Sequence, residues 1–506
     1  MGGGTAGWLT AAVLAAGHDS CLGSGVQVTL IESPDVATIG VGEGTWPSMR
    51  DTLAKIGVSE REFISECSAS FKQGSKFVGW RSGEETDFYY HPFSLPQGYL
   101  HVNPVPFWQS EHAEQPFAAA FSTQHALCEA GKAPKQAATP EYAAVANYGY
   151  HLDAGKFAGL LRRHCTEKLG VNHVLDHVIA INSAEGGDIE SLTTKSTGLL
   201  AADLFIDCSG VAALLLGGHF GVPFVSKKDV LFNDRAIAIQ APYASDTDPI
   251  ASATIATAQR SGWIWDIGLP TRRGVGYVYS SDHETDDGAE KALMQYLSKG
   301  REVGASSSAA PRVIKFNPGY REKFWHRNCV AVGMSSGFIE PLEASAIALV
   351  EMSAWMIRDE LPADRAIMDC VARRYNERFR YRWERVIEFL KLHYVLTNRT
   401  DSSYWRDHCA SEHTPERLLE LLELWKFQPP SRYDLVQAEE VFPSASYQYV
   451  LYGMGFTTRG RVTTSRRDNF DLAMRYYREN ARLTEKQING LPGNRELIDH
   501  IVRMVS

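Results

Sequence analysis

The pattern of apolar and polar positions changes about two thirds of the way along this chain of 506 residues. Up to about residue 340, short apolar runs end in Gly-rich turns, which is typical of strands. Beyond that point the apolar spacing is helical, and we expect helices over 347–360, 364–392, 415–426, 469–480 and from 485 to the end. The pattern predicts an α/β module over 1–342 and a mainly helical module over 343–506, packed as one integrated unit.

A stretch rich in proline and aromatic residues, about 87–142, interrupts the first module. It contains His91, Pro92 and Phe93. We interpret this stretch as an excursion that lines a substrate pocket. A surface loop explains the same composition equally well.

The N-terminus carries a nucleotide fingerprint. Gly2, Gly4 and Gly7 form G-x-G-x-x-G, and a helix of small residues and a strand over 26–31 follow. The glycines allow a tight turn and the close approach of a pyrophosphate to the helix N-terminus, where Thr5 and Ala6 also lie. Glu32, at the end of the strand, is placed to accept a ribose hydroxyl.

A strand normally precedes such a fingerprint, yet nothing stands before these glycines. We expect a truncated start and a weakened nucleotide site; a protein that does without this strand is the alternative. Two later strand–turn segments, 201–210 with Asp207 and 328–337 with Gly333, favour FAD over NAD. An N-terminal fingerprint with two distant strand–turn returns is the layout of large flavoprotein monooxygenases, in which FAD spans most of the module.

Glu343 stands where the Gly/Ser-rich segment changes into the helical pattern, two residues after Pro341. A proline at this point predicts a helix start, so we expect Glu343 in the first helical turn. The free backbone N–H groups and dipole of such an end attract small anions. A carboxylate beside an anion site suggests chemistry on a halide, although a simple helix cap is the commoner reason for an acidic residue there.

Composition narrows the class of protein. The formal charge of −9 argues against nucleic acid or an anionic membrane as partner. The eight cysteines are scattered without a C-x-x-C pair, which indicates reduced thiols in the cytoplasm and no zinc site. We find no signal peptide and no apolar run long enough to span a membrane.

Several motifs in order make the chain similar to a known family. They are the N-terminal fingerprint, the segment 40–47 with Gly40, Gly42 and Glu43, the segment 66–77 with Lys72, the segment 150–154, the pair 262–267 and 276–281 with Trp263 and Trp265, and the segment 340–343. Over nearly its whole length the chain resembles the flavin-dependent halogenases of the tryptophan-halogenase family.

The resemblance implies a mechanism and its residues. FADH2, supplied by a separate NAD(P)H-dependent flavin reductase, reacts with O2 to a flavin hydroperoxide, and a halide converts this to hypohalous acid. The acid travels to Lys72, which hydrogen-bonds it or forms a haloamine, while Glu343 places the oxidant and accepts the proton of the ring carbon. Ser345 and Ala346 would hold the halide, with Ala346 also at the flavin.

Some of these residues also have a simpler, purely structural interpretation. Lys72 and Lys76 at i,i+4 are typical of a solvated helix face. Trp263 and Trp265 would lie on one face of a strand, which is commonly just core. In the family this segment lies beside the flavin and separates it from the substrate.

Two departures from the family pattern bear on specificity. Ala344, Ser345 and Ala346 replace the usual Ser-Thr-Gly, which favours bromide over chloride. The stretch between Trp405 and Tyr447 is shorter than in members that act on free tryptophan, so we expect a more open site, lined by Tyr447, for an indole-type substrate. An aromatic hydroxylase and a non-catalytic FAD-binding protein are the alternatives, and a monomer or a homodimer is expected.

Overall fold

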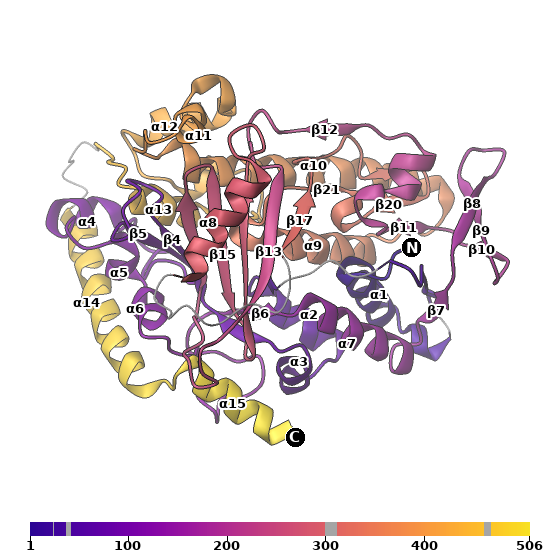
Figure 1. Ribbon diagram of the computed structural model, residues 1–506, viewed down its shortest axis with the longest axis horizontal. Helices are drawn as coiled ribbons and strands as arrows, with labels where there is room; N and C mark the ends of the chain where they lie inside the picture. The colour runs from indigo at the N-terminus through magenta and orange to yellow at the C-terminus, as the bar shows by residue number, and fades with distance from the viewer. Residues whose placement is uncertain (24, 37–41, 299–310, 460–466, 506) are drawn as a thin grey trace.

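The computed structural model describes residues 1–23, 25–36, 42–298, 311–459 and 467–505 (Figure 1). The expected cofactor residue Gly40 lies outside these ranges. A large twisted sheet occupies the middle of the molecule (Figure 1). The N-terminus lies on one side of this sheet, together with the expected nucleotide-binding elements, and this side is called the nucleotide side. The C-terminal helices run along the opposite side (Figure 1).

The nucleotide side is built around α1, whose small residues let it pack closely between two other helices, α7 and α9. Leu9, Ala12 and Val13 of α1 are fully buried. Strand β1 pairs in parallel with β7, and β11 pairs in parallel with β20. The elements are α1 (Thr5–Gly17), β1 (Thr29–Glu32), α7 (Ala154–Glu167), β7 (Asn172–Leu175), β11 (Phe205–Asp207), β19 (Trp325–His326), β20 (Cys329–Ala331) and α9 (Ser345–Asp359).

Met1 and Gly2 lie between these two parallel pairs. The Gly2 amide donates to the Ile31 carbonyl at 2.8 Å, and the Cys208 amide donates to the Met1 carbonyl at 2.8 Å. The first two residues therefore join β1 to β11 at the start of the glycine turn.

Smaller sheets extend this side of the molecule. Strands β8, β9 and β10 form an antiparallel projection at its edge (Figure 1), and β12, β18 and β21 form another small sheet. The elements are β8 (Val178–Ser183), β9 (Ile189–Thr194), β10 (Leu199–Ala201), β12 (Phe224–Ser226), β18 (Gly319–Arg321) and β21 (Gly337–Phe338).

The large sheet has the strand order β17-β13-β16-β15-β14-β4-β5, with β4 parallel to β14 and its other pairs antiparallel. Helix α8 lies across one face, which carries Ile264 in a buried cluster with Ala289 and Leu293. Trp263 and Trp265 point to the other face, toward the main core. The elements are β4 (Gly74–Val78), β5 (Phe88–Pro92), β13 (Arg235–Pro242), β14 (Thr254–Gln259), β15 (Gly262–Gly268), β16 (Arg272–Tyr279), α8 (Asp286–Ser298) and β17 (Arg312–Lys315).

A short sheet of order β2-β6-β3 lies beside the large one and carries the segments around Gly44 and Lys72. The Pro- and aromatic-rich excursion supplies β5 and three short helices that pack on α13 and α14. The elements are β2 (Glu43–Gly44), α2 (Ser48–Ile56), α3 (Glu60–Glu66), β3 (Ser70–Lys72), α4 (Val105–Glu111), α5 (Phe117–Phe121), α6 (Thr123–Glu129) and β6 (Gly149–Leu152).

Every described element after residue 344 is helical, as the pattern predicts. They are the short turns η6 (Ser411–His413) and η7 (Arg432–Asp434) and the helices α9 (Ser345–Asp359), α10 (Arg365–Val395), α11 (Ser403–His408), α12 (Glu416–Trp425), α13 (Ser444–Gly453), α14 (Arg467–Gly490) and α15 (Asn494–Val505). The expected break over 481–484 is wrong, because α14 continues through it and ends before Pro492 and Gly493, the stronger breakers. The division into two modules at 342 stays a prediction.

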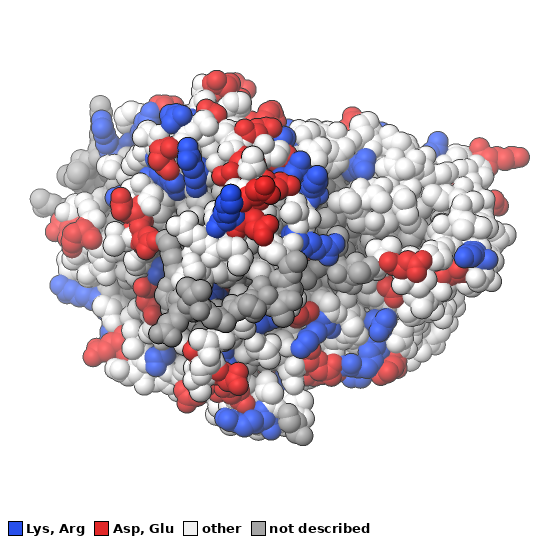
Figure 2. Space-filling view, in the orientation of Figure 1, with Lys and Arg blue, Asp and Glu red and all other residues white. Residues whose placement is uncertain are grey.

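Acidic and basic side chains are interspersed over the face in Figure 2, and the nucleotide side on the right is largely uncharged there. Among the described residues, no helix is both long and apolar enough to cross a membrane. In the same residues, no group of three or more His, Cys, Asp or Glu side chains is placed to hold a metal ion.

Candidate functional site

Lys72 is the last residue of β3, where it pairs with Gly149 of β6, and it is 1 % exposed. The solvated helix face is therefore wrong: Lys76 lies on the next strand, β4, in an ion pair with Glu129 at 2.5 Å. A local i,i+4 spacing cannot reveal that Lys72 ends one strand and that the next strand begins at Gly74, with only Gln73 between them.

The Lys72 ammonium donates no hydrogen bond to any described residue, and its Nζ lies 5.3 Å from the centroid of the Phe93 ring. Burial lowers the pKa of Lys72 to about 8, and the charge of Glu343 opposes part of that shift. A buried amine with free donor capacity and a pKa near neutrality is suited to meet a small polar reagent.

Glu343 is 5 % exposed and lies in the tight turn η5 (Leu342–Ala344), directly before α9. The expectation that it belongs to the first helical turn is wrong, because α9 begins at Ser345. Glu343 has φ +65° and Ala344 has φ +55°. Two consecutive non-glycine residues in the left-handed region are strained, and such strain concentrates at functional sites.

The Glu343 carboxylate is enclosed by polar groups from three other segments. Its Oε1 lies 2.7 Å from Nδ1 of His91 and 3.4 Å from Nε2 of His393, and Ser75 donates to Oε2 at 3.3 Å. Burial alone would raise the pKa of Glu343, but the two histidines outweigh it and hold the pKa well below its usual value. The site therefore keeps Glu343 ionised.

The segment 42–47 packs against both expected catalytic residues. A Cβ on Gly44 would lie 3.1 Å from Nζ of Lys72 and 3.3 Å from Cβ of Ala344. The indole nitrogen of Trp46 donates to the backbone carbonyl of Glu343 at 2.8 Å. This segment therefore brings Lys72 and the Glu343 turn to one place.

Rings line the approach to Glu343. His91 and Pro92 are buried and Phe93 is half-buried, so these residues do not form a surface loop. Whether they line a substrate pocket stays a prediction. The sequence analysis missed Phe442, whose ring centroid lies 6.3 Å from that of His91 and 4.9 Å from that of Trp46.

Tyr447 is placed one ring further away. It is 1 % exposed, and its ring packs against Phe389 and Trp425. Its neighbour Ser446 reaches His91, with 2.9 Å between Oγ and Nε2. Whether Tyr447 lines the pocket stays a prediction.

Trp263 is anchored from behind by a second buried acid. Its indole N–H donates to Oε2 of Glu340 at 2.7 Å, and the same oxygen accepts from Asn233 at 2.7 Å and from Tyr394 at 2.6 Å. Trp265 packs 6.4 Å from Trp263 between ring centroids. The two indoles therefore form one wall of fixed orientation, and Glu340 was not recognised from the sequence as its support.

The glycine turn is tightly packed at Gly2 and Gly7 and open at Gly4. A Cβ on Gly2 would lie 2.2 Å from the Cys208 carbonyl oxygen, and one on Gly7 would lie 1.8 Å from the Gly2 carbonyl oxygen. A Cβ on Gly4 meets no atom within 4 Å, so the space before α1 is open. Because α1 also lacks a side-chain cap, its first amides, near Thr5 and Ala6, are available to phosphate oxygens.

Two further expected cofactor residues, Glu32 and Gly333, lie close to the glycine turn and α1, and their contact with FAD stays a prediction. Glu32 lies against Gly3 and bonds His173 at 2.7 Å. Gly333, at φ +74°, lets its turn pack on Ala6.

Glu43, Gly42 and Asp207 are further expected cofactor residues, and their contact with FAD stays a prediction. Burial, with Asp153 nearby, raises the pKa of Glu43 to about 7, and Gly42 lies against Gly274. Asp207 accepts hydrogen bonds from the amides of Ser209, Leu215 and Leu216, so its carboxylate shapes the turn from within.

The expected halide residues begin α9. Ser345 is buried and Ala346 is exposed, and α9 has no side-chain cap. The first amides of this helix therefore lack an intrahelical acceptor and are available to an anion.

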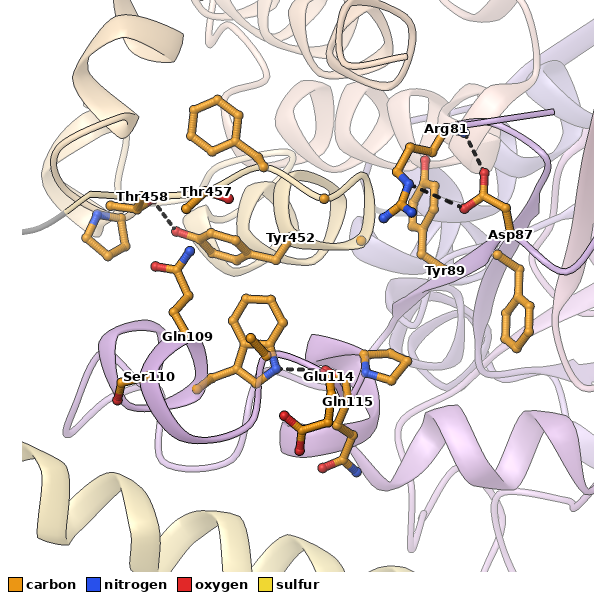
Figure 3. A pocket seen from close by; sticks show the side chains of 18 of the residues that line it. Arg81, Asp87, Tyr89, Gln109, Ser110, Glu114, Gln115, Tyr452, Thr457 and Thr458 are labelled. Atoms are coloured by element: carbon orange, nitrogen blue, oxygen red, sulfur yellow. Dashed lines mark hydrogen bonds and ion pairs between the residues drawn. The ribbon is translucent and has the colours of Figure 1, made fainter. Parts of the chain in front are cut away.

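A cavity of about 860 Å³ lies apart from Lys72 and Glu343 (Figure 3). Figure 3 shows Gln109, Tyr452 and Thr458 on one side of it and the pair Arg81 and Asp87 on another. Tyr89 lies at its edge. Since neither Lys72 nor Glu343 lines this cavity, its size does not identify it as the reaction site.

Comparison with known proteins decides the family. The model of the tryptophan halogenase family matches residues 1–467. This chain belongs to the tryptophan halogenase family. It is 33 % identical over 477 residues to tryptophan 6-halogenase SttH of Streptomyces toxytricini, which covers 90 % of this chain and 88 % of that protein.

Solved structures agree with this result. The tryptophan halogenase from Shewanella frigidimarina NCIMB 400 superposes with a TM-score of 0.95 at 52 % identity, over 99 % of this chain and 96 % of that one. Tar14, a tryptophan C-6 flavin-dependent halogenase (chlorinase) from taromycin biosynthesis, gives 0.91 at 33 % identity, over 99 % and 98 %. The predicted fold is confirmed, and the chain is an enzyme of the flavin-dependent halogenase type.

Proposed function

We propose that this halogenase uses Lys72 and Glu343 to halogenate an indole-type aromatic compound, with bromide preferred over chloride. The observation that supports this most directly is their shared setting: a buried lysine with unused donor capacity and an ionised, buried glutamate meet at the segment around Gly44. When bound, reduced FAD with O2 and halide supplies hypohalous acid.

Lys72 receives that acid in this proposal. Its ammonium donates a hydrogen bond to the oxygen and so raises the electrophilic character of the halogen, which the ring carbon attacks. Because no described residue engages Nζ, the donor is available without breaking an internal bond.

Glu343 then removes the proton from the halogenated ring carbon. A carboxylate with a lowered pKa is a weak base, yet it is sufficient here because an arenium carbon is a very strong acid. His91 and Phe93 hold the ring plane, and Trp263 and Trp265 separate it from the cofactor.

Substrate class follows from the segment before Tyr447. Phe427, Tyr433 and Val436 are 66 %, 80 % and 77 % exposed, so this short stretch leaves apolar side chains outside the core. We infer an open site with little grip on an amino-acid backbone, which favours indole or a larger indole derivative over tryptophan. Reaction then falls at the most electron-rich carbon, the 3-position of indole.

Halide preference is inferred from the turn. Ala344 and Ala346 stand where the family has serine and glycine, and bromide is oxidised more easily than chloride. Both points favour bromination, although the second applies to any enzyme of this type.

The cofactor supply is proposed to be diffusive. The sequence shows no second nucleotide fingerprint for NAD(P)H, so a separate flavin reductase in the cytoplasm provides FADH2 to a monomer or a homodimer. Purified protein with FAD should not oxidise NADH at the turnover rate.

One experiment tests substrate and halide together. Indole, a larger indole derivative and tryptophan are each offered with bromide and with chloride, and products are identified by mass and ring position. We expect bromination of indole at carbon 3 to be fastest. Faster conversion of tryptophan, or chlorination of a benzo-ring carbon, would show a closed and directing pocket instead.

A further inference from the structure

We propose that His393, fixed in one tautomer by the hydroxyl of Tyr89, is a positioning residue for the Glu343 carboxylate. The proposal rests on the function proposed above. Tyr89 Oη lies 2.6 Å from Nδ1 of His393. Nε2 of the same ring lies 3.4 Å from Oε1 of Glu343, within ion-pair distance but outside hydrogen-bond geometry, and it has no hydrogen-bond partner among the described residues. The three side chains come from β5, α10 and the turn before α9.

The tautomer follows from the donors available. A neutral imidazole has one N–H and one lone pair, whereas the phenol hydroxyl can donate. When Tyr89 donates to Nδ1, the proton sits on Nε2 and faces the carboxylate. The opposite tautomer would place a lone pair against a carboxylate oxygen, so the network assigns Nε2–H.

Burial supports the same assignment. Among the described residues, Tyr89 has no other hydrogen-bond acceptor, and burial raises its pKa well above the usual value, so the phenol keeps its proton. Burial lowers the pKa of His393, more than Glu343 raises it. The ring is therefore neutral, and its single N–H is available to Glu343.

Packing fixes the plane of the imidazole. Phe77 lies 4.6 Å from His393 between ring centroids, Phe389 meets it edge-on at 5.4 Å, and Tyr89 stacks on Phe77 at 4.8 Å. A ring held on these sides cannot turn its other nitrogen toward Glu343. The direction of the N–H beside the Glu343 carboxylate is therefore set before substrate arrives.

His91 repeats the arrangement from the other side. Its Nδ1 faces Glu343 and its Nε2 faces the Ser446 hydroxyl. Two imidazoles, each with a hydroxyl behind it, thus place a ring nitrogen near the same carboxylate oxygen. This leaves Oε2, which only Ser75 contacts among the described residues, as the oxygen that takes the substrate proton.

The test compares His393→Gln, His393→Asn and Tyr89→Phe. A glutamine amide reaches the place of Nε2 and restores the donor, whereas the asparagine amide reaches only the place of Nδ1. We expect His393→Asn to lower kcat about tenfold to a hundredfold, and His393→Gln to retain most of it. Tyr89→Phe should lower kcat in the wild-type background but not beside His393→Gln, because an amide has no tautomer to fix.

Equal losses in the Asn and Gln variants, or the same effect of Tyr89→Phe in both backgrounds, would overturn the proposal and indicate a role in packing. Nitrogen-15 NMR of labelled histidine gives a readout independent of activity. The signals that vanish in His393→Gln should report a protonated Nε2, and Tyr89→Phe should move the proton to Nδ1. A protonated Nδ1 in the wild type contradicts the proposal, whereas absence of halogenation by the wild type contradicts the proposed function alone.

Discussion

The indole nitrogen of Trp46 donates a hydrogen bond of 2.8 Å to the backbone carbonyl of Glu343, which lies 297 positions later in the chain. This contact ties the segment beside the expected flavin to the strained turn that presents the carboxylate. Gly44 on the same segment also lies against Lys72. A movement of this segment would therefore displace both the Lys72 ammonium and the turn that carries the Glu343 carboxylate. The positions of the two proposed catalytic residues, Lys72 and Glu343, are therefore linked through this segment.

Lys72→Ala should reduce halogenation by a factor of about 100 or more, because it removes the donor that meets the oxidant. FAD affinity and the release of peroxide should change little, since Lys72 acts after the flavin step. Product is measured by mass spectrometry and peroxide by a coupled assay. Lys76→Ala is the matched control, because its half-buried ion pair with Glu129 contributes little to stability. Equal losses of halogenation in both variants would contradict the proposed role of Lys72.

The pH dependence should show the lowered pKa of Lys72. Burial brings it from 10.5 to about 8, so the ammonium donor is lost as pH rises through about 8, and kcat should fall there. A rate that rises through the same pH would favour a haloamine, which needs the neutral amine. Glu43, with a pKa of about 7, titrates nearby; the falling limb should persist in Glu43→Gln.

The sequence predicted the local structure around these residues better than it predicted their tertiary contacts. The fingerprint of Gly2, Gly4 and Gly7 predicted the α1 turn, because its steric requirements are local. The helical periodicity after 344 was equally informative. The partners of Glu343 were not predicted, because His91 and His393 lie 252 and 50 positions away and are brought together by tertiary packing.

The errors have local causes. Pro341 was read as a helix start, but the left-handed residues Glu343 and Ala344 delay α9 to Ser345. Likewise, the i,i+4 spacing of Lys72 and Lys76 concealed a strand–turn–strand. In both cases a short backbone feature without a strong sequence signature decided the position of a functional side chain.

Gly44→Ala should impair catalysis more than folding. The new methyl group would lie 3.1 Å from Nζ of Lys72, the mobile end of a side chain, and 3.3 Å from Cβ of Ala344. Lys72 can shift, so the free energy of unfolding should drop by only about 1 kcal/mol, whereas kcat should fall about tenfold. Gly159→Ala, in a helix with no atom near the new Cβ, is the control; it should leave kcat unchanged and raise the free energy of unfolding by up to about 1 kcal/mol, because alanine suits a helix better than glycine.

Gly4→Ala should weaken FAD binding without weakening the fold. The backbone of Gly4, at φ −78° and ψ −176°, suits any residue, and its Cβ would meet no protein atom within 4 Å. The methyl group would instead enter the open space before α1, where the pyrophosphate is expected, and raise the Kd for FAD about tenfold. Titration by flavin fluorescence measures Kd, and thermal unfolding without FAD checks the fold. Gly186→Ala, which also meets no atom, should alter neither value; an unchanged Kd in Gly4→Ala would mean that the cofactor does not approach this turn.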